Sequence, residues 1–208
     1  MTAPLPVSND AARQQLGFLS LADTLALANR GVMILDPSST LISPGVDIGA
    51  LVIFWPGTVV QRLGQSSITI GNGTALFPGT RIVADGGTVA IGALAEIGEE
   101  GGFTVKAEAG AAITIGNTAR LLGGGSLTLS NDIGNGAQIL GPIRCQNCAL
   151  GNGGDYREPD PDRRGGVLKG SGVARNLHVS QGHVIQSFDL FANAPLRRQT
   201  EFHPKPGA

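Results

Sequence analysis

Apolar residues recur at every sixth position over much of this sequence, and this spacing constrains the fold more than any other feature. The longest unbroken tract has them at Ile91, Ile97, Phe103, Ala109, Ile115, Leu121, Leu127, Ile133, Ile139 and Cys145. Shorter tracts in shifted frames cover 42–60 and 70–82, and a last one has Val167, Val173, Val179, Ile185 and Phe191. A small residue often lies two positions earlier, on the same face of a strand, because side chains alternate. The repeat predicts stacked short strands that share one apolar core.

Glycine is abundant, at 32 of 208 residues, and often follows the repeated apolar residue. Examples are Gly49, Gly71, Gly92, Gly98, Gly116 and Gly134, with asparagine next in line at Asn72, Asn117 and Asn135. Both residue types accept backbone conformations that branched side chains resist, so we expect them at corners. Three faces of six residues make one triangular coil, and roughly 22 hexads predict about seven coils.

This pattern resembles the left-handed parallel β-helix of the hexapeptide-repeat proteins, which implies an all-β prism over residues 31–192. Breaks in the frame predict loops near 61–67, near 83–88 and in the polar segment 151–166. Residues 1–30 form a predicted N-terminal helical segment, and 193–208, which lack any period, an irregular C-terminal tail.

Within the N-terminal segment, SLADTLALANRG predicts a helix that begins after the N-cap Ser20, with Asp23 in the capping-box position, and stops at Gly31. Leu21, Leu25 and Ala28 then share one face. The preceding NDAARQQLGF predicts a second short helix.

Composition excludes several classes of partner. The formal net charge is −1 and charged residues make up 15%, with no basic stripe, so a nucleic-acid partner is not expected. No 18-residue apolar run exists, so no membrane span is expected. The N-terminus lacks the basic and apolar regions of a secretory signal, and two cysteines cannot form a disulfide framework, so we expect a cytoplasmic protein.

The stretch RGVMILDPSSTLISPGVDIGALVIFWPGTVV at residues 30–60, with the helix before it, has a closer resemblance. It is similar to the entry of the acetyltransferase half of bacterial bifunctional N-acetylglucosamine-1-phosphate uridylyltransferases; the nucleotidyltransferase half is absent. The resemblance implies a coenzyme A-dependent acyltransferase, with acetyl-CoA as co-substrate and a sugar-like or other small polar acceptor. It also implies a homotrimer with active clefts between subunits, and no metal.

The resemblance assigns site residues by segment. In TRIVADGG, Arg81 matches the first arginine of the acceptor-binding motif, and Val83 replaces the second. In GGFTVKAEAG, Lys106 lies one position from the expected lysine, and SLTLSND places Ser126 where the family has its histidine base. Serine cannot accept a proton from an amine at neutral pH.

A rival placement in LKGSGVARNLHVSQG makes His178 the base. His178 precedes the inward Val179, so it is expected to face outward, whereas His183 is expected to face inward. A neutral imidazole can deprotonate an amine or hydroxyl that attacks a thioester. An ordinary exposed histidine fits the same pattern.

Other candidates come from charge and position. Tyr156 and Arg157 lie in the predicted loop 151–166, and such loops often border a cleft, so both are candidates for substrate contact. Arg144 and Lys169, and also Arg120, are candidates for binding the phosphates of coenzyme A. Each of these residues also fits a solvated surface.

Two further patterns favour the plainer interpretation. Cys145 and Cys148 form a C-x-x-C without the helix of a redox motif and without a second pair for zinc, so we expect a core cysteine beside an incidental one. His178 and His183 are five apart, like two zinc ligands of the γ-class carbonic anhydrases, but they are expected on opposite sides of the wall.

The alternative to an acyltransferase is a non-acylating hexapeptide-repeat protein. It would be a ligand-binding or structural trimer, or an enzyme of different chemistry that reuses the cleft. The missing second arginine and the displaced histidine favour this alternative.

Overall fold

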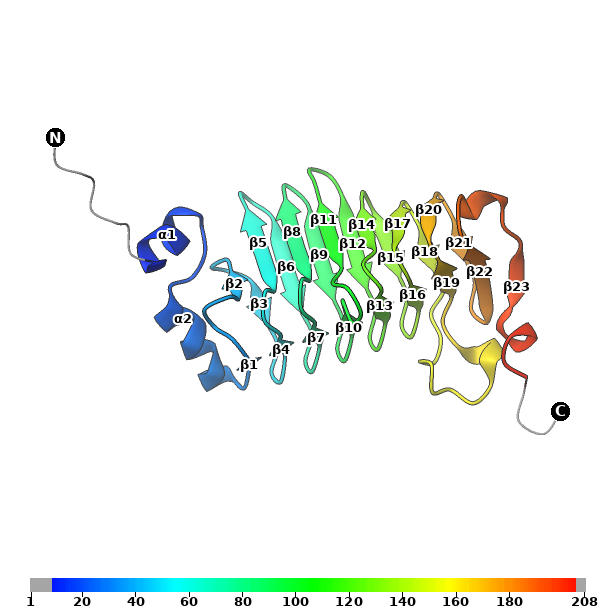
Figure 1. Cartoon of the computed structure of the whole chain (residues 1–208), viewed down its shortest axis with the longest axis horizontal. Helices are drawn as coiled ribbons and strands as arrows, with labels where there is room; N and C mark the ends of the chain where they lie inside the picture. Colours follow the sequence, from blue (N-terminus) through cyan, green and yellow to red (C-terminus); the bar gives the residue numbers. More distant parts are fainter. Residues whose placement is uncertain (1–8, 205–208) are drawn as a thin grey trace.

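The chain folds into a parallel β-solenoid, as shown by a computed structural model that describes residues 9–204 (Figure 1). The chain passes through three sheets in turn, here named A, B and C, and each strand pairs in parallel with the strand one coil later. The predicted all-β class with parallel sheets is confirmed. The predicted end segments 1–30 and 193–208 extend beyond the described residues at either end.

Sheet A has nine strands, β1 (Met33–Ile34), β4 (Ile53–Phe54), β7 (Ala75–Leu76), β10 (Glu96–Ile97), β13 (Arg120–Leu122), β16 (Gln138–Leu140), β19 (Val167–Gly170), β22 (His183–Ser187) and β23 (Leu196–Arg198). Sheet B has seven, β2 (Leu41–Ile42), β5 (Val59–Leu63), β8 (Arg81–Asp85), β11 (Thr104–Ala107), β14 (Ser126–Thr128), β17 (Ile143–Gln146) and β20 (Gly172–Arg175). Sheet C has seven, β3 (Asp47–Ile48), β6 (Ser67–Ile70), β9 (Thr88–Ile91), β12 (Ala112–Ile115), β15 (Asn131–Ile133), β18 (Ala149–Leu150) and β21 (His178–Val179).

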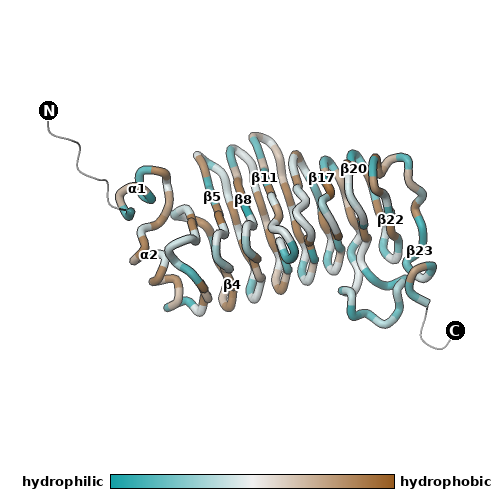
Figure 2. Tube along the Cα trace, in the orientation of Figure 1, coloured by the Kyte–Doolittle hydropathy of each residue, from teal (hydrophilic) through white to brown (hydrophobic). Residues whose placement is uncertain are grey.

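The core is a stack of apolar side chains that the strands of the three sheets point inward. On sheet A the buried column runs through Phe54, Leu76, Ile97, Leu121, Ile139, Leu168 and Ile185, which pair in register. Figure 2 shows the resulting recurrence of hydrophobic residues along the coils. The six-residue repeat therefore predicts most of the core correctly.

The repeat fails in the coil that contains β11. Ala109 is exposed, and Val105 rather than Phe103 occupies the column of sheet B, although Phe103 is also buried. Ile97 pairs with Leu121, so this coil holds more residues than the predicted 18. The additional residues widen the corners on both sides of β11, which a fixed six-residue frame cannot represent.

The predicted six-residue frame is also wrong in two other parts of the solenoid. In the last tract Leu168 and Ala174 point into the core, one position after the predicted Val167 and Val173, because strand pairing after the 151–166 insertion sets a new register. The breaks predicted as loops near 61–67 and 83–88 are partly strand. There β5 and β8 pair as far as Leu63 and Asp85, and the chain turns after these residues.

Glycine and asparagine do form corners, most regularly between sheets C and A. The side-chain oxygen of Asn117 accepts a hydrogen bond from the Ala93 amide at 2.8 Å, and that of Asn135 accepts one from the Asn117 amide at 2.7 Å. Gly116 precedes Asn117, and a Cβ atom there would overlap the backbone nitrogen of Asn135. Successive coils therefore approach each other so closely at this corner that only glycine fits.

The N-terminal segment covers the first coil. It contains α1 (Asn9–Gln15), α2 (Leu21–Ala26) and the 3-10 helix η1 (Leu27–Arg30), which stops at Gly31 with a φ of 76°. The predicted cap is confirmed, because Ser20 accepts a hydrogen bond from the Asp23 amide at 3.0 Å. The predicted apolar face is wrong, since Leu25 is 53% exposed and Thr24 is buried instead.

Arg13 explains this reversal. Its guanidinium is buried and donates to the Thr24 hydroxyl at 3.0 Å and to the carbonyls of Leu19 and Thr40 at 2.9 and 2.8 Å. The polar side of α2 therefore faces inward, where it binds a charged group that also joins both helices to the first coil.

The C-terminal segment is less irregular than expected. It forms the 3-10 helices η3 (Phe191–Asn193) and η4 (Gln199–Glu201), with β23 between them, and β23 runs antiparallel to β22. Phe191 is fully buried against the last coil. Across residues 9–204, none of the helices has the length and apolar character required to cross a bilayer.

We expect Gly116→Ala to destabilise the protein by about 2 kcal/mol or more, because the added methyl group meets backbone atoms that cannot move aside. Urea denaturation followed by circular dichroism measures the change. Gly110→Ala is the control: Gly110 has a φ of 76° but open space around it, so only backbone strain of about 1–2 kcal/mol is expected. A larger effect at Gly110 than at Gly116 would show that close stacking is not the constraint.

Candidate functional site

The structure distributes the predicted site residues over all three outer faces of the solenoid. Sheet B carries Arg81, Lys106, Ser126 and Arg144, sheet C carries His178, and sheet A with its covering loop carries Tyr156, Arg157 and Lys169. One chain therefore does not bring the predicted base together with the predicted acceptor-binding residues.

On sheet B, strand pairing aligns three of these residues in one outward row. The row runs from Arg81 through Thr104 and Ser126 to Arg144, one residue per coil. At a strand spacing of about 4.8 Å, the two arginines lie about 14 Å apart with two hydroxyl groups between them. Such a row can bind an extended anionic or polar ligand through guanidinium and hydroxyl donors.

Lys106 lies in the neighbouring row and has a carboxylate partner. Its ammonium group donates to Glu108, and this contact lowers the pKa of the Glu108 carboxyl. Both side chains are exposed. The predicted role of Lys106 in binding an acceptor anion would therefore have to compete with an ion pair within its own strand and corner.

His178 is exposed at the start of β21, as predicted. Its strand neighbour on the previous coil is Ala149, which leaves the imidazole open to solvent on the outer face of sheet C. His183 is half-buried rather than in the core, and its Nδ1 lies 2.8 Å from the Gln181 carbonyl oxygen. Among the described residues no group of three histidine, cysteine, aspartate or glutamate side chains could hold a metal ion.

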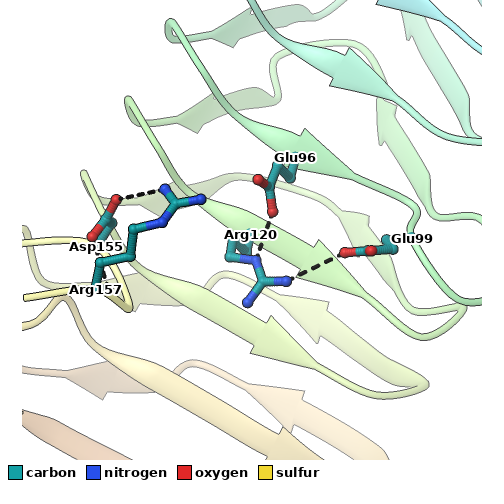
Figure 3. Close-up of polar contacts among 5 residues, drawn as sticks. All are labelled: Glu96, Glu99, Arg120, Asp155 and Arg157. Atoms are coloured by element: carbon teal, nitrogen blue, oxygen red, sulfur yellow. Dashed lines mark hydrogen bonds and ion pairs between the residues drawn. The ribbon is translucent and has the colours of Figure 1, made fainter.

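On sheet A, the loop 151–166 lies against the outer face and Tyr156 holds it there. Two guanidinium groups lie over the Tyr156 ring, with the Cζ atoms of Arg120 and Arg157 at 4.2 and 4.5 Å from its centroid. Arg120 also donates to Glu96 at 2.7 Å and to Glu99 at 3.3 Å, and Arg157 pairs with Asp155 at 3.4 Å (Figure 3). We name this cluster the tyrosine clamp.

The tyrosine clamp borders a cleft of about 340 Å³ that is also lined by the apolar residues Phe77 and Leu94. Phe77 stacks on Trp55 with ring centroids 5.6 Å apart. Because carboxylates already neutralise Arg120, this arginine does not offer a free charge to a phosphate group, contrary to its predicted role. The clamp acts as a structural latch for the loop.

A second hollow, the tail pocket, lies on the other side of Tyr156 and has a volume of about 220 Å³. Its floor is the outer face of β16, β19 and β22, and its walls come from the loop 151–166 and from the C-terminal residues around η4. Lys169 lies on this floor. The structure thus brings together Tyr156 and Lys169, which the sequence assigns to different ligands.

Sequence reasoning missed several residues that shape these sites. Glu96 and Glu99, which neutralise Arg120, and Phe202 and Gln199, which close the tail pocket, were not singled out. The periodic pattern carried a signal for Glu96 alone, since it directly precedes the inward Ile97 and so faces outward. Nothing in the sequence pattern placed the C-terminal residues against sheet A.

The cysteine pair lies at the corner between sheets B and C, with both side chains buried. The Cys145 thiol donates a hydrogen bond to Cys148, which lowers the pKa of Cys148 to about 6 although burial opposes the shift. The same hydrogen bond, together with burial, raises the pKa of Cys145. The predicted core position of Cys145 is confirmed, and the Cys148 thiol also lies 3.5 and 3.4 Å from the carbonyl oxygens of Gln146 and Ala174.

No protein-family model matches the chain, and no curated protein sequence matches it. The fold defines the class: the protein is a parallel β-solenoid with a clamped loop on one face.

For the tyrosine clamp, we expect Tyr156→Leu to release the loop 151–166. Of the two cation–π contacts, only that of Arg120 joins the loop to sheet A, and at a partly exposed site it contributes about 0.5–1 kcal/mol, so amide hydrogen exchange of Gly154 and Glu158 should accelerate about 2- to 5-fold. Both amides now bond within the loop, to Arg163 and Asp155 carbonyls. Tyr156→Phe keeps the ring and should leave exchange unchanged; equal exchange in the Leu variant would exclude the clamp as the latch.

For the cysteine pair, we expect thiolate absorbance at 240 nm to rise with a midpoint near pH 6, the pKa of Cys148. Cys145→Ala removes the hydrogen-bond donor and leaves burial as the main influence, so the midpoint should move up by at least about two pH units. Cys148→Ala should abolish the low transition. A wild-type midpoint above pH 8 would contradict the lowering of the Cys148 pKa by Cys145.

Proposed function

We propose that this chain is a coenzyme A-dependent acyltransferase that acts at clefts between left-handed prisms of about seven coils, assembled as a cytoplasmic homotrimer. Acetyl-CoA is the proposed co-substrate, and the acceptor is a sugar-like or other small polar molecule with an amine or hydroxyl group. The observation that carries the proposal is the row of Arg81, Ser126 and Arg144 on sheet B, combined with an exposed His178 on sheet C.

A trimer would bring these two faces together. Interfaces in a cyclic trimer are heterologous, so a different face of each subunit meets its neighbour. Sheet B of one prism and sheet C of the next then line one cleft. This arrangement supplies the base from one subunit and the arginine row from the other, which a single chain does not do.

The chemistry then needs few groups. The acceptor nitrogen or oxygen attacks the thioester carbonyl carbon while the His178 imidazole takes its proton. The carbon–sulfur bond breaks, and the leaving thiolate of coenzyme A takes that proton back from the imidazolium. Arg144 and Arg81 bind phosphate or acceptor oxygens as guanidinium donors, and Ser126 supplies a hydroxyl group rather than a base. Orientation in the cleft provides much of the rate enhancement.

The second candidate is a non-acylating protein, either a ligand-binding or structural trimer or an enzyme of different chemistry. Charge neutralisation favours it, because Lys106 and Arg120 bind carboxylates of this chain instead of remaining free for a substrate. Exposed apolar side chains on sheet A also suit self-association, with Met33, Leu35 and Trp55 all more than one-third exposed.

Calorimetric titration of the oligomer, after its mass is verified by light scattering, with acetyl-CoA tests the first candidate. We expect saturable binding at one site per chain in the micromolar range, and loss of at least about 100-fold of acetyl transfer in His178→Ala. His183→Ala is the matched control and should retain turnover. Failure of the intact oligomer to bind acetyl-CoA would overturn the acyltransferase proposal in favour of the second candidate.

A further inference from the structure

We propose that the tail pocket on sheet A binds a small organic anion that carries one planar apolar group, of the size of an aryl phosphate or an aromatic carboxylate. This site is separate from the proposed acyl-transfer cleft, which involves sheets B and C. The inference rests on four properties of the tail pocket: its floor, its charge, its apolar surface and its preformed walls.

The floor is a regular grid made by three adjacent strands of sheet A. In one row Gln138, Val167 and Val184 pair in register, and in the next row Leu140, Lys169 and Gln186 do so. All six residues line the pocket. The grid offers an apolar surface with a carboxamide at one end of each row, from Gln138 and Gln186. The Lys169 ammonium group lies in the middle of the second row.

The formal charges that line the pocket are positive. Lys169 and Arg164 line it together with the imidazole of His203, and among residues 9–204 no aspartate or glutamate does so. The Arg164 Nε donates to the Glu158 carbonyl at 2.7 Å, which fixes the guanidinium at the wall. Within the same described range, none of the ion pairs involves Lys169, Arg164 or His203.

The acidic side chains of the covering segments point to other partners. Glu158 accepts a hydrogen bond from the Asp160 amide, Asp162 pairs with Arg198, and Glu201 accepts from the Arg198 amide. Among the described residues, none of these carboxylates lines the tail pocket, so a ligand that brings a negative charge would pair with Lys169 and Arg164 there.

The apolar part of the ligand has a matching surface. Phe202 is 38% exposed although it lines the pocket, and Leu140, Val167 and Val184 lie beneath it. An aromatic ring placed between Phe202 and this floor would remove both from water. A volume of about 220 Å³ corresponds to roughly seven water molecules, which accommodates one ring and one charged group but not coenzyme A.

The walls are held in place without a ligand. The Gln199 side chain is only 4% exposed, and its Nε2 donates to the Gly165 carbonyl at 2.7 Å and to the His183 carbonyl at 3.3 Å. Gln199 thus ties the C-terminal segment to both the loop 151–166 and the last coil. A pocket with preformed walls loses little conformational entropy on binding.

The test is a titration of the purified full-length chain with phenyl phosphate, followed by isothermal calorimetry and by ligand-observed NMR. We expect saturable binding, at least about tenfold tighter than benzyl alcohol, which lacks the charge, and than inorganic phosphate, which lacks the ring. Lys169→Gln should weaken phenyl phosphate binding at least about fivefold, and Phe202→Ala should do the same.

Arg175→Gln is the matched control, since Arg175 is an exposed cation on sheet B that bonds to Gln146. It should leave the affinity unchanged. Three results would overturn the proposal: no binding up to about 10 mM by a protein with native circular dichroism, equal binding of benzyl alcohol, or equal losses in the Lys169 and Arg175 variants. These outcomes are independent of whether acetyl-CoA binds, because that ligand is too large for the tail pocket.

Discussion

The close approach of successive coils at the corner between sheets C and A is the constraint on which the rest of this structure depends. Backbone amides there donate to asparagine side chains one coil away, and glycine provides the space for that contact. Because this corner fixes the distance between coils, it also fixes the register of all three sheets. The outward rows that carry the candidate site residues inherit their spacing from it.

That dependence explains what the sequence could predict. The inward column and the glycine–asparagine corners are local and periodic. The sequence therefore predicts directly that Ile115 is buried and that Gly116 and Asn117 form a corner. Coil length is not local: the residues added around β11 leave the six-residue spacing of the sequence intact while they move Ala109 out of the core. The exposure of His178 followed from its phase. The tyrosine clamp and the tail pocket did not, because they depend on how a non-periodic loop and tail fold back on sheet A.

The cations of this protein fall into two groups with different roles. Arg13, Arg120 and Lys106 bind groups of the chain itself. Arg13 joins the helices to the first coil, Arg120 holds the loop, and Lys106 pairs with Glu108. Lys169 and Arg164 converge on a hollow without a carboxylate among the described residues that line it. The same residue types thus serve stability at one place and leave a positive potential at another. Residue type alone does not show the difference, because the carboxylates that neutralise Arg120, Glu96 and Glu99, come from the preceding coil.

The two ends of the solenoid differ from its middle in a way that limits how copies can associate. Each internal coil presents strand edges to the next, and an uncovered terminal coil would offer the same edges to another molecule. Here the N-terminal helices, anchored by Arg13, cover the first coil, while Phe191 and the antiparallel β23, with its two arginines, cover the last (Figure 1). For copies of this chain to add end to end through these strand edges, the covering segments would first have to be displaced.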